Sequence, residues 1–177
     1  IGVKTGNYTS GTVVLDLGYA IGSVDGIVRI QDYAYDWISR TSAADNQWRG
    51  IAWSPQLSLF AAVSATGTGN RVMTSPDGIT WTARTSAVDN DWYGIAWAPS
   101  ISLFAAVAQT GVGNRVMTSP DGITWTARTS AVDNSWVAIA WSPQLSLFAA
   151  ASITGTGNRV MTTYGNKTAL ATVLTEL

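Results

Sequence analysis

The amino-acid sequence predicts an all-β fold built from repeated units, and three features carry this prediction. A 44-residue segment recurs along the chain, hydrophobic residues alternate with a period of two, and clusters of Gly, Pro, Asn and Asp separate the alternating runs. Four short antiparallel strands that recur about every 40 to 50 residues are typical of a β-propeller. A two-sheet sandwich is the alternative, but a sandwich does not require near-identical repeats.

The repeat is defined by a segment that starts at Arg40 and recurs from Arg84 and from Arg128, which sets the period at 44 residues (84 − 40 and 128 − 84). The first two of these copies differ at nine of 44 positions, which excludes chance similarity. A shift of 44 also places Trp37 under Trp81, so a degenerate copy precedes them. We therefore predict one repeat domain, residues 1–177, with a four-stranded blade in each of four units, the first and last degenerate: 1–39, 40–83, 84–127 and 128–177.

Each unit is expected to hold four antiparallel strands, as the unit at 40–83 illustrates. Period-two alternation and β-branched or aromatic residues predict strands at 50–53, 57–64, 71–75 and 79–84. The Ser75-Pro76-Asp77-Gly78 sequence before the last strand has the Pro and Gly positions of a type I turn. No segment has helical periodicity, so no helix is predicted.

The composition excludes several functional classes. With 46% hydrophobic residues the chain can bury a core, whereas only 12% of its residues are charged and its net charge is −1. Nucleic-acid binding and membrane-surface binding need a basic patch, so neither is expected. No apolar run approaches about 18 residues, so no membrane insertion is expected. The chain contains no Cys and no His, which removes thiol and imidazole chemistry, and neither a cofactor nor a metal is predicted.

The turn sequence SPDGITW, present twice, resembles the Asp-box (BNR) motif of sialidase-like β-propellers, S-x-D-x-G-x-T-W, shortened by one residue. Similar repeats occur in bacteriophage tail and other virion surface proteins. The resemblance implies that the motif is structural. Its Asp accepts hydrogen bonds from turn amides, its Gly supplies a positive φ, and its Trp fills the space beside the hairpin. The residues assigned this structural role are Ser75, Asp77, Gly78, Trp81, Ser119, Asp121, Gly122 and Trp125.

A catalytic role is not expected. The resemblance implies that sialidase chemistry needs an arginine cluster, a Tyr–Glu pair and an acid, and glycosidases in general need two carboxylates that face one substrate. The only Glu is Glu176, next to the C-terminus. Arginines recur at one repeat position, which is typical of residues that brace each blade: Arg71, Arg115 and Arg159. A glycoside hydrolase is therefore only a distant alternative.

One face of the predicted propeller is the candidate binding site. The copies differ most in the connection that precedes each first strand and in the connection between the second and third strands, and both lie on the same face of an antiparallel blade. A tryptophan beside Asp and Asn in the former is the chemistry that sugar recognition uses, although a packed blade junction has the same composition. Drift at exposed loops would also vary this face. The candidate ligand-binding residues are Trp48, Trp92, Trp136, Asp45, Asp89, Asp133, Arg49 and Tyr93, with Val137 beside them.

These features predict a non-catalytic propeller on a virion surface, as a phage tail or capsid decoration protein, with a structural role, a host-glycan-binding role or both. A secreted propeller lectin is the alternative, and an extracellular or virion location suits either function. A homo-oligomer or contact with neighbouring virion subunits is expected, because four blades can close within one chain or form an eight-bladed ring across two. The segment at 31–37 is the expected contact.

Overall fold

The computed structural model describes residues 20–24, 27–31 and 37–164 of the chain. The chain divides into two compact units, residues 1–39 and residues 40–177. In the first unit, β1 (Ala20–Val24) pairs antiparallel with β2 (Ile27–Gln31). Residues 37–39 are also described, whereas most of the expected contact segment 31–37, namely residues 32–36, lies outside the described residues.

The second unit holds three consecutive antiparallel sheets, which we call blades 1, 2 and 3. Each sheet follows chain order, and the described part of blade 3 has three strands. The predicted all-β propeller fold is confirmed at the level of these blades. Blade 1 comprises β3 (Trp48–Ser54), β4 (Leu59–Ser64), β5 (Val72–Ser75) and β6 (Thr82–Arg84). Blade 2 comprises β7 (Trp92–Ala98), β8 (Leu103–Ala108), β9 (Val116–Ser119) and β10 (Thr126–Arg128). Blade 3 comprises β11 (Trp136–Ser142), β12 (Leu147–Ser152) and β13 (Val160–Thr162).

The predicted four four-stranded blades need a correction in the first unit. There the structure describes a two-stranded hairpin whose strands are joined by residues 25–26, whereas residues 65–71 join the corresponding strands of blade 1. The short connection shifts the register: Val24 pairs with Ile27, whereas Val63 pairs with Val72 in blade 1. The described part of the first unit therefore does not follow the blade pattern.

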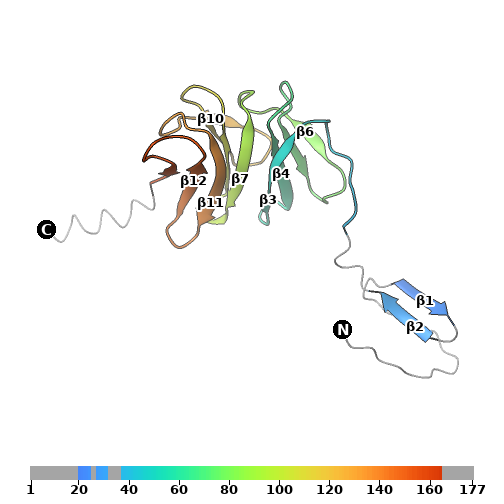
Figure 1. Ribbon diagram of the computed structural model, residues 1–177. Helices are drawn as coiled ribbons and strands as arrows, with labels where there is room; N and C mark the ends of the chain where they lie inside the picture. Colours follow the sequence, from blue (N-terminus) through green and yellow to red (C-terminus); the bar gives the residue numbers. More distant parts are fainter. Residues whose placement is uncertain (1–19, 25–26, 32–36, 165–177) are drawn as a thin grey trace. The chain divides into compact units, whose positions relative to one another are not determined.

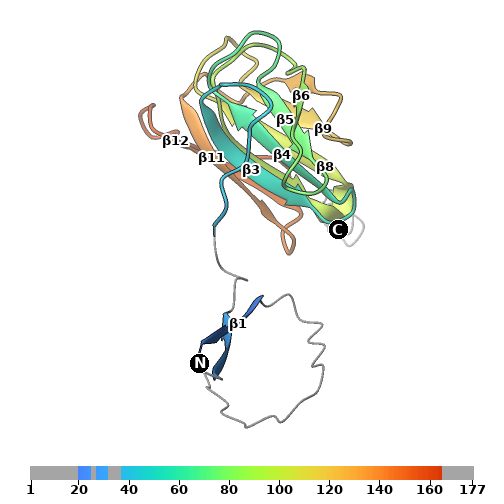
Figure 2. The same cartoon turned by 90° about the vertical axis from the view of Figure 1, so that its right-hand side faces the viewer.

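The blades stack through their first strands. Strand β7 packs against β3 on one side and β11 on the other, and it lies between them in Figure 1. The turned view in Figure 2 shows the strands of blade 1, β3, β4, β5 and β6. Blade 2 therefore has a neighbour on each face, and every residue of β8 from Phe104 to Ala108 is buried. Strand β12 in blade 3 instead alternates between buried and more exposed residues, because only one of its faces is covered by another described blade.

The core consists of the contacts between blades. Ala61, Val63 and Val72 of blade 1 pack against a set of blade 2 residues that includes Trp97 and Phe104, all at most 8% exposed. Smaller clusters around Phe148 and Trp136 join blade 2 to blade 3. One short 3-10 helix, Pro99–Ile101, occupies the turn between β7 and β8, where no helix was predicted.

Candidate functional site

In each of the two Asp boxes, the polar side chains form hydrogen bonds within their own turn. In blade 1, Ser75 Oγ donates to Asp77 Oδ1 over 2.9 Å, and the amide of Gly78 donates to Ser75 Oγ over 2.9 Å. The amides of Ile79 and Thr80 both donate to Asp77 Oδ1 over 2.8 Å. Gly78 has φ of 71°, which favours glycine. The box of blade 2 repeats these bonds through Ser119, Asp121 and Gly122, and the Trp125 indole also donates to the Gly122 carbonyl.

These bonds determine the charge state of the box carboxylates. Backbone hydrogen bonds from Thr80 and Ile79, together with the Ser75 hydroxyl, lower the pKa of Asp77 to about 2. Burial raises the pKa of Asp121, but the amides of Thr124 and Ile123 outweigh burial and hold it below its ordinary value. Both carboxylates are therefore ionised acceptors inside a turn, which suits a structural role and not a proton donor.

The candidate binding face is formed by two connections of each blade together with the first two residues of β3, β7 and β11. We call this face the rim: 41–49 with 65–71, 85–93 with 109–115, and 129–137 with 153–159. One asparagine joins the two connections in each blade. In blade 2, Asn90 Nδ2 donates to the Asn114 carbonyl over 3.0 Å, and Asn46 and Asn134 make the same bond in blades 1 and 3. The two connections do lie on one face, as the sequence predicted.

Two of the predicted rim aspartates hold neighbouring blades together. Asp89 accepts the Gly69 amide of the preceding blade at 2.9 and 3.0 Å, and Asp133 accepts the Gly113 amide at the same distances. Arg71 adds to the first junction by donating to Asp91 Oδ1 over 2.8 Å and to the carbonyl of Gly67 in its own blade. Asp45, in contrast, is exposed, and within the described residues no hydrogen bond engages its carboxylate.

The predicted role of Trp92 and Trp136 as stacking platforms is wrong. Both side chains are 0% exposed, and their indole N–H groups donate to the Val88 and Val132 carbonyls over 3.0 Å. A fully buried ring has no face on which a ligand could stack. These two rings instead pack between neighbouring blades, where burying their large apolar surface stabilises the fold. Trp48 makes the equivalent bond to Ala44 but is partly exposed, since no described blade precedes it.

One accessible part of the rim is a patch across blades 1 and 2. The guanidinium carbon of Arg49 lies 5.1 Å from the centre of the Tyr93 ring, within the range of a cation–π contact. Arg49 Nη2 also donates to Gln47 Oε1 over 2.9 Å. Gln47 and Arg49 are exposed and Tyr93 is partly exposed. The sequence identified Arg49 and Tyr93 as variable positions, but not that they contact each other.

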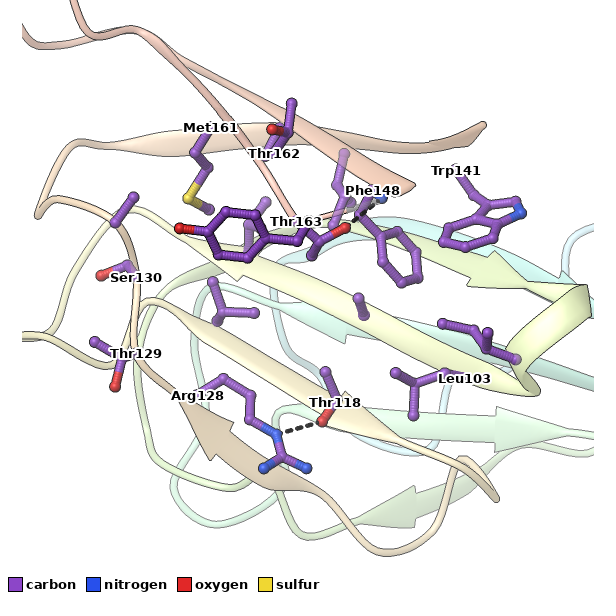
Figure 3. Close-up of a pocket in the computed structure, with 18 of the residues that line it drawn as sticks. Leu103, Thr118, Arg128, Thr129, Ser130, Trp141, Phe148, Met161, Thr162 and Thr163 are labelled. Carbon is purple, nitrogen blue, oxygen red and sulfur yellow. Dashed lines mark hydrogen bonds between the residues drawn. The ribbon is translucent and has the colours of Figure 1, made fainter. Parts of the chain in front are cut away.

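A cavity of about 1040 Å³ lies between blades 2 and 3, and sequence reasoning missed it. Its walls are mostly apolar and include Leu103, Trp141, Phe148 and Met161, and Thr118 and Arg128 line one side (Figure 3). Arg128 Nε donates to Thr118 Oγ1 over 2.8 Å there. Trp141 Nε1 is buried without a hydrogen-bond partner. The size and lining are those of a binding cavity for an apolar group.

The described residues contain no group of three or more Asp, Glu, His or Cys side chains that could hold a metal ion. Among these residues, no helix has the length and hydropathy needed to cross a membrane.

The chain matches no family model and no curated protein. Solved structures similar to it include a nidogen/laminin complex (13% identity, TM-score 0.49, covering 67% of this chain) and the β-propeller domain of Cps50 (Swd1) from Myceliophteria thermophila (14%, 0.42, 58%). A luciferin-regenerating enzyme is another (13%, 0.47, 80%). This chain spans 44%, 34% and 45% of the length of those three chains. The propeller assignment therefore rests on the blades themselves.

Proposed function

We propose that the chain is a non-catalytic propeller module of a virion surface, with a structural role and a host-glycan-binding rim. The observation that supports the structural role is that its repeated polar residues hold turns and blades together. Asp89 and Asp133 join blades, and Asp77 and Asp121 close turns. Together with the resemblance of its turns to Asp boxes, this supports a rigid, repeated surface protein, located on a virion or outside the cell.

The use of its carboxylates supports a non-catalytic role. Asp89 and Asp91 both lie beside Arg71, at 3.8 and 2.8 Å from its nitrogen atoms. Two neighbouring carboxylates are what a glycosidase needs, but such a pair must face a substrate. Here Asp89 is bound to the Gly69 amide and Asp91 to Arg71, so this pair serves the junction between blades.

The patch of Gln47, Arg49 and Tyr93 is the part of the rim that supports glycan binding. It combines an aromatic ring, a guanidinium and a side-chain amide, which can stack on a sugar and bond to its hydroxyls. A site of this size binds weakly, so attachment would require several sites that act together in an oligomer or on a particle. A secreted lectin would use the same patch and remains the alternative function.

The proposal is tested by glycan-array binding of the protein displayed on beads at high density. The variants Arg49→Val and Tyr93→Val each introduce valine, because the third clear copy has a valine, Val137, at this repeat position. We expect wild-type beads to bind a subset of glycans and both variants to lose most of this binding. Ile79→Ala is the matched control, because Ile79 is exposed in the Asp-box turn at the far end of blade 1.

Each outcome bears on a different part of the proposal. Binding that survives both rim variants would remove the patch as the glycan site, and absence of binding to every glycan would leave only the structural role. Release of free sugar from any bound glycan would overturn the non-catalytic assignment. Immunogold labelling of assembled particles, or capsid and tail genes beside the coding sequence, would separate a virion protein from a secreted lectin.

A further inference from the structure

In the described part of the chain, blade 3 has a strand edge and a cavity at the place where blades 1 and 2 carry a fourth strand. In blade 1, β6 pairs with β5 through Thr74–Thr82, Met73–Ala83 and Val72–Arg84. Blade 2 repeats this pairing between β9 and β10. The described part of blade 3 ends its sheet at β13, whose residues Val160 and Thr162 are exposed.

The cavity lies where the tryptophan of a fourth strand would pack. Trp81 and Trp125, which precede β6 and β10, each lie 6.2 Å from the phenylalanine of their own blade, Phe60 and Phe104. The corresponding phenylalanine of blade 3 is Phe148, and it lines the cavity. The chain's own residue at the tryptophan position of this unit is Ala169, 44 residues after Trp125. An alanine cannot fill such a space.

A sequence that matches the fourth strand of blades 1 and 2 precedes blade 1. Residues 37–40 read Trp-Ile-Ser-Arg and lie 44 residues before Trp81-Thr82-Ala83-Arg84. They belong to no strand, and Trp37 is 101% exposed. In blades 1 and 2 the arginine of this sequence donates to a threonine of the third strand, Arg84 to Thr74 and Arg128 to Thr118, over 2.9 and 2.8 Å. Thr162 is the corresponding threonine of β13.

We propose that residues 37–40 of a second copy of this chain form the fourth strand of blade 3, with Trp37 in the cavity beside Phe148 and Arg40 bonded to Thr162. The occupant is a second copy because residues 41–47 lead directly into β3, so blade 1 must follow on the free face of blade 3. The three described blades of one chain fall short of the roughly four to eight that close a propeller, whereas two chains supply six. The inference rests on the homo-oligomer that the sequence predicts and specifies its interface.

The outer faces of blades 1 and 3, which no other described blade covers, carry complementary groups. Asp45 corresponds to Asp89 and Asp133, which accept a glycine amide of the preceding blade. The corresponding glycine of blade 3 is Gly157, whose amide has no acceptor among the described residues. Trp53 corresponds to Trp97, whose indole donates to Gln56 over 2.7 Å, and Gln144 of blade 3 corresponds to Gln56. Each unpaired group on blade 1 therefore has its counterpart on blade 3.

The same faces are apolar where a blade would cover them. Ile51 and Trp53 on blade 1 are 58% and 41% exposed, whereas their counterparts Ile95 and Trp97 are 8% and 7% exposed under blade 1. On blade 3, Val160 is 68% exposed, whereas Val72, at the same position of blade 1, is fully buried. A head-to-tail contact between two copies buries both faces at once.

One position distinguishes this junction from those within the chain. Gly50 and Gly94 let neighbouring first strands approach so closely that a Cβ would lie 2.5 Å from the Tyr93 carbonyl or 3.1 Å from the Val137 carbonyl. The corresponding residue in blade 3 is Ala138. The first strands must therefore be farther apart at the junction between copies, where the smaller Ala151 also stands in place of Val63 and Val107.

Disulfide cross-linking tests the proposed strand pairing, because the chain has no cysteine of its own. In the expected register Ile38 of one copy lies opposite Thr162 of the other, as Thr82 lies opposite Thr74. Paired strand positions are close enough for a disulfide. Two differently tagged full-length chains, one Ile38→Cys and the other Thr162→Cys, are mixed and oxidised. We expect a covalent species that carries both tags. Thr118→Cys replaces Thr162→Cys in the control, because Thr118 already pairs with Thr126.

The outcomes are separate from those of the glycan experiment, since no ligand is involved. A cross-link only within the Ile38→Cys, Thr162→Cys double variant would show that the chain completes its own blade and would overturn the proposal. So would a monomer in sedimentation, a dimer in which these positions do not cross-link, or equal cross-linking of the Thr118→Cys control. A cross-linked dimer that binds no glycan would support this interface and remove only the glycan role.

Discussion

At the scale of single residues, small differences between near-identical repeats have identifiable consequences. Trp97 and Trp141 occupy the same position in blades 2 and 3, yet only Trp97 has a partner for its indole N–H, the side chain of Gln56 in the turn of the preceding blade. The residue of blade 2 that corresponds to Gln56 is Ser100, which lies in the 3-10 turn at Pro99–Ile101. Its side chain is too short to accept a hydrogen bond from the Trp141 indole. One substitution thus leaves a buried donor unsatisfied, which is costly in a protein core.

The first prediction concerns two single variants, each of which places the residue of one blade at the corresponding position of the other. Ser100→Gln should raise the free energy of unfolding by about 1 kcal/mol by giving Trp141 Nε1 an acceptor. Gln56→Ser should lower it by about 1–3 kcal/mol by creating the same defect at Trp97. Urea denaturation followed by tryptophan fluorescence measures both. A Gln56→Ser variant as stable as wild type would show that the bond contributes nothing.

The second prediction concerns acid. The pKa of Asp77 is lowered in the folded chain from 3.8 to about 2, so the folded state favours the ionised carboxylate. The stability that this provides is complete above about pH 4 and is lost as the pH falls towards 2. Asp77→Asn should therefore reduce the melting temperature at pH 7 and flatten its decline between pH 4 and pH 2, as scanning calorimetry can measure. Asp121→Asn should act in the same direction, and an unchanged slope in both variants would contradict this account.

At the scale of elements, the sequence located the strands of a blade and the structure explains where their ends differ. The last strand was predicted from residue 79 but begins at Thr82, because Asp77 already binds the amides of Ile79 and Thr80. The second strand begins at Leu59 and not at residue 57, since Ser58 has φ of 47°. Alternation identifies a strand, but the hydrogen bonds and turn geometry at its ends decide its length.

The burial of Trp92 and Trp136 could not be predicted in the same way. A tryptophan beside Asp and Asn is as typical of a sugar site as of a junction between blades, so composition does not distinguish them. The distinction depends on whether another blade covers the ring, which is a tertiary property. The repeat gave one signal that these tryptophans are structural. Tryptophan is present at this position in all three clear copies (Trp48, Trp92 and Trp136), whereas the next position varies (Arg49, Tyr93 and Val137).

The third prediction concerns the close approach of β3 and β7. A Cβ at residue 50 would lie 2.5 Å from the Tyr93 carbonyl oxygen, which is backbone and cannot turn aside. Gly50→Ala should therefore cost about 1–3 kcal/mol of unfolding free energy by forcing the two blades apart. Gly94→Ala is the comparison, with a smaller expected loss since its nearest contacts are at 3.1 Å. Urea unfolding of both variants checks this order, and a greater loss in Gly94→Ala would refute it.

At the scale of the whole molecule, the repeat predicted what each blade looks like but not how many blades form. The units at 40–83 and 84–127 became complete blades, whereas the short 25–26 connection gives the first unit another register. Repeat proteins gain stability mainly from contacts between neighbouring units, so a terminal blade with an uncovered face is a weak point. The exposed Ile51 and Trp53 on blade 1 and Val160 on blade 3 mark the two weak points of this chain.

The last prediction concerns how stability depends on concentration. If a second copy covers both terminal faces, unfolding is coupled to dissociation, and the melting temperature must rise with chain concentration. A tenfold increase should raise it by about 2 °C for a dimer of chains this long. Trp37→Ala should abolish the dependence without altering the melting temperature at high dilution, because the Trp37 side chain is fully exposed in the described part of the chain. Ile38→Thr should retain the dependence, since threonine is the residue at this position in blades 1 and 2. A melting temperature of the wild-type chain that does not change over a hundredfold range would mean that these faces have no partner in solution.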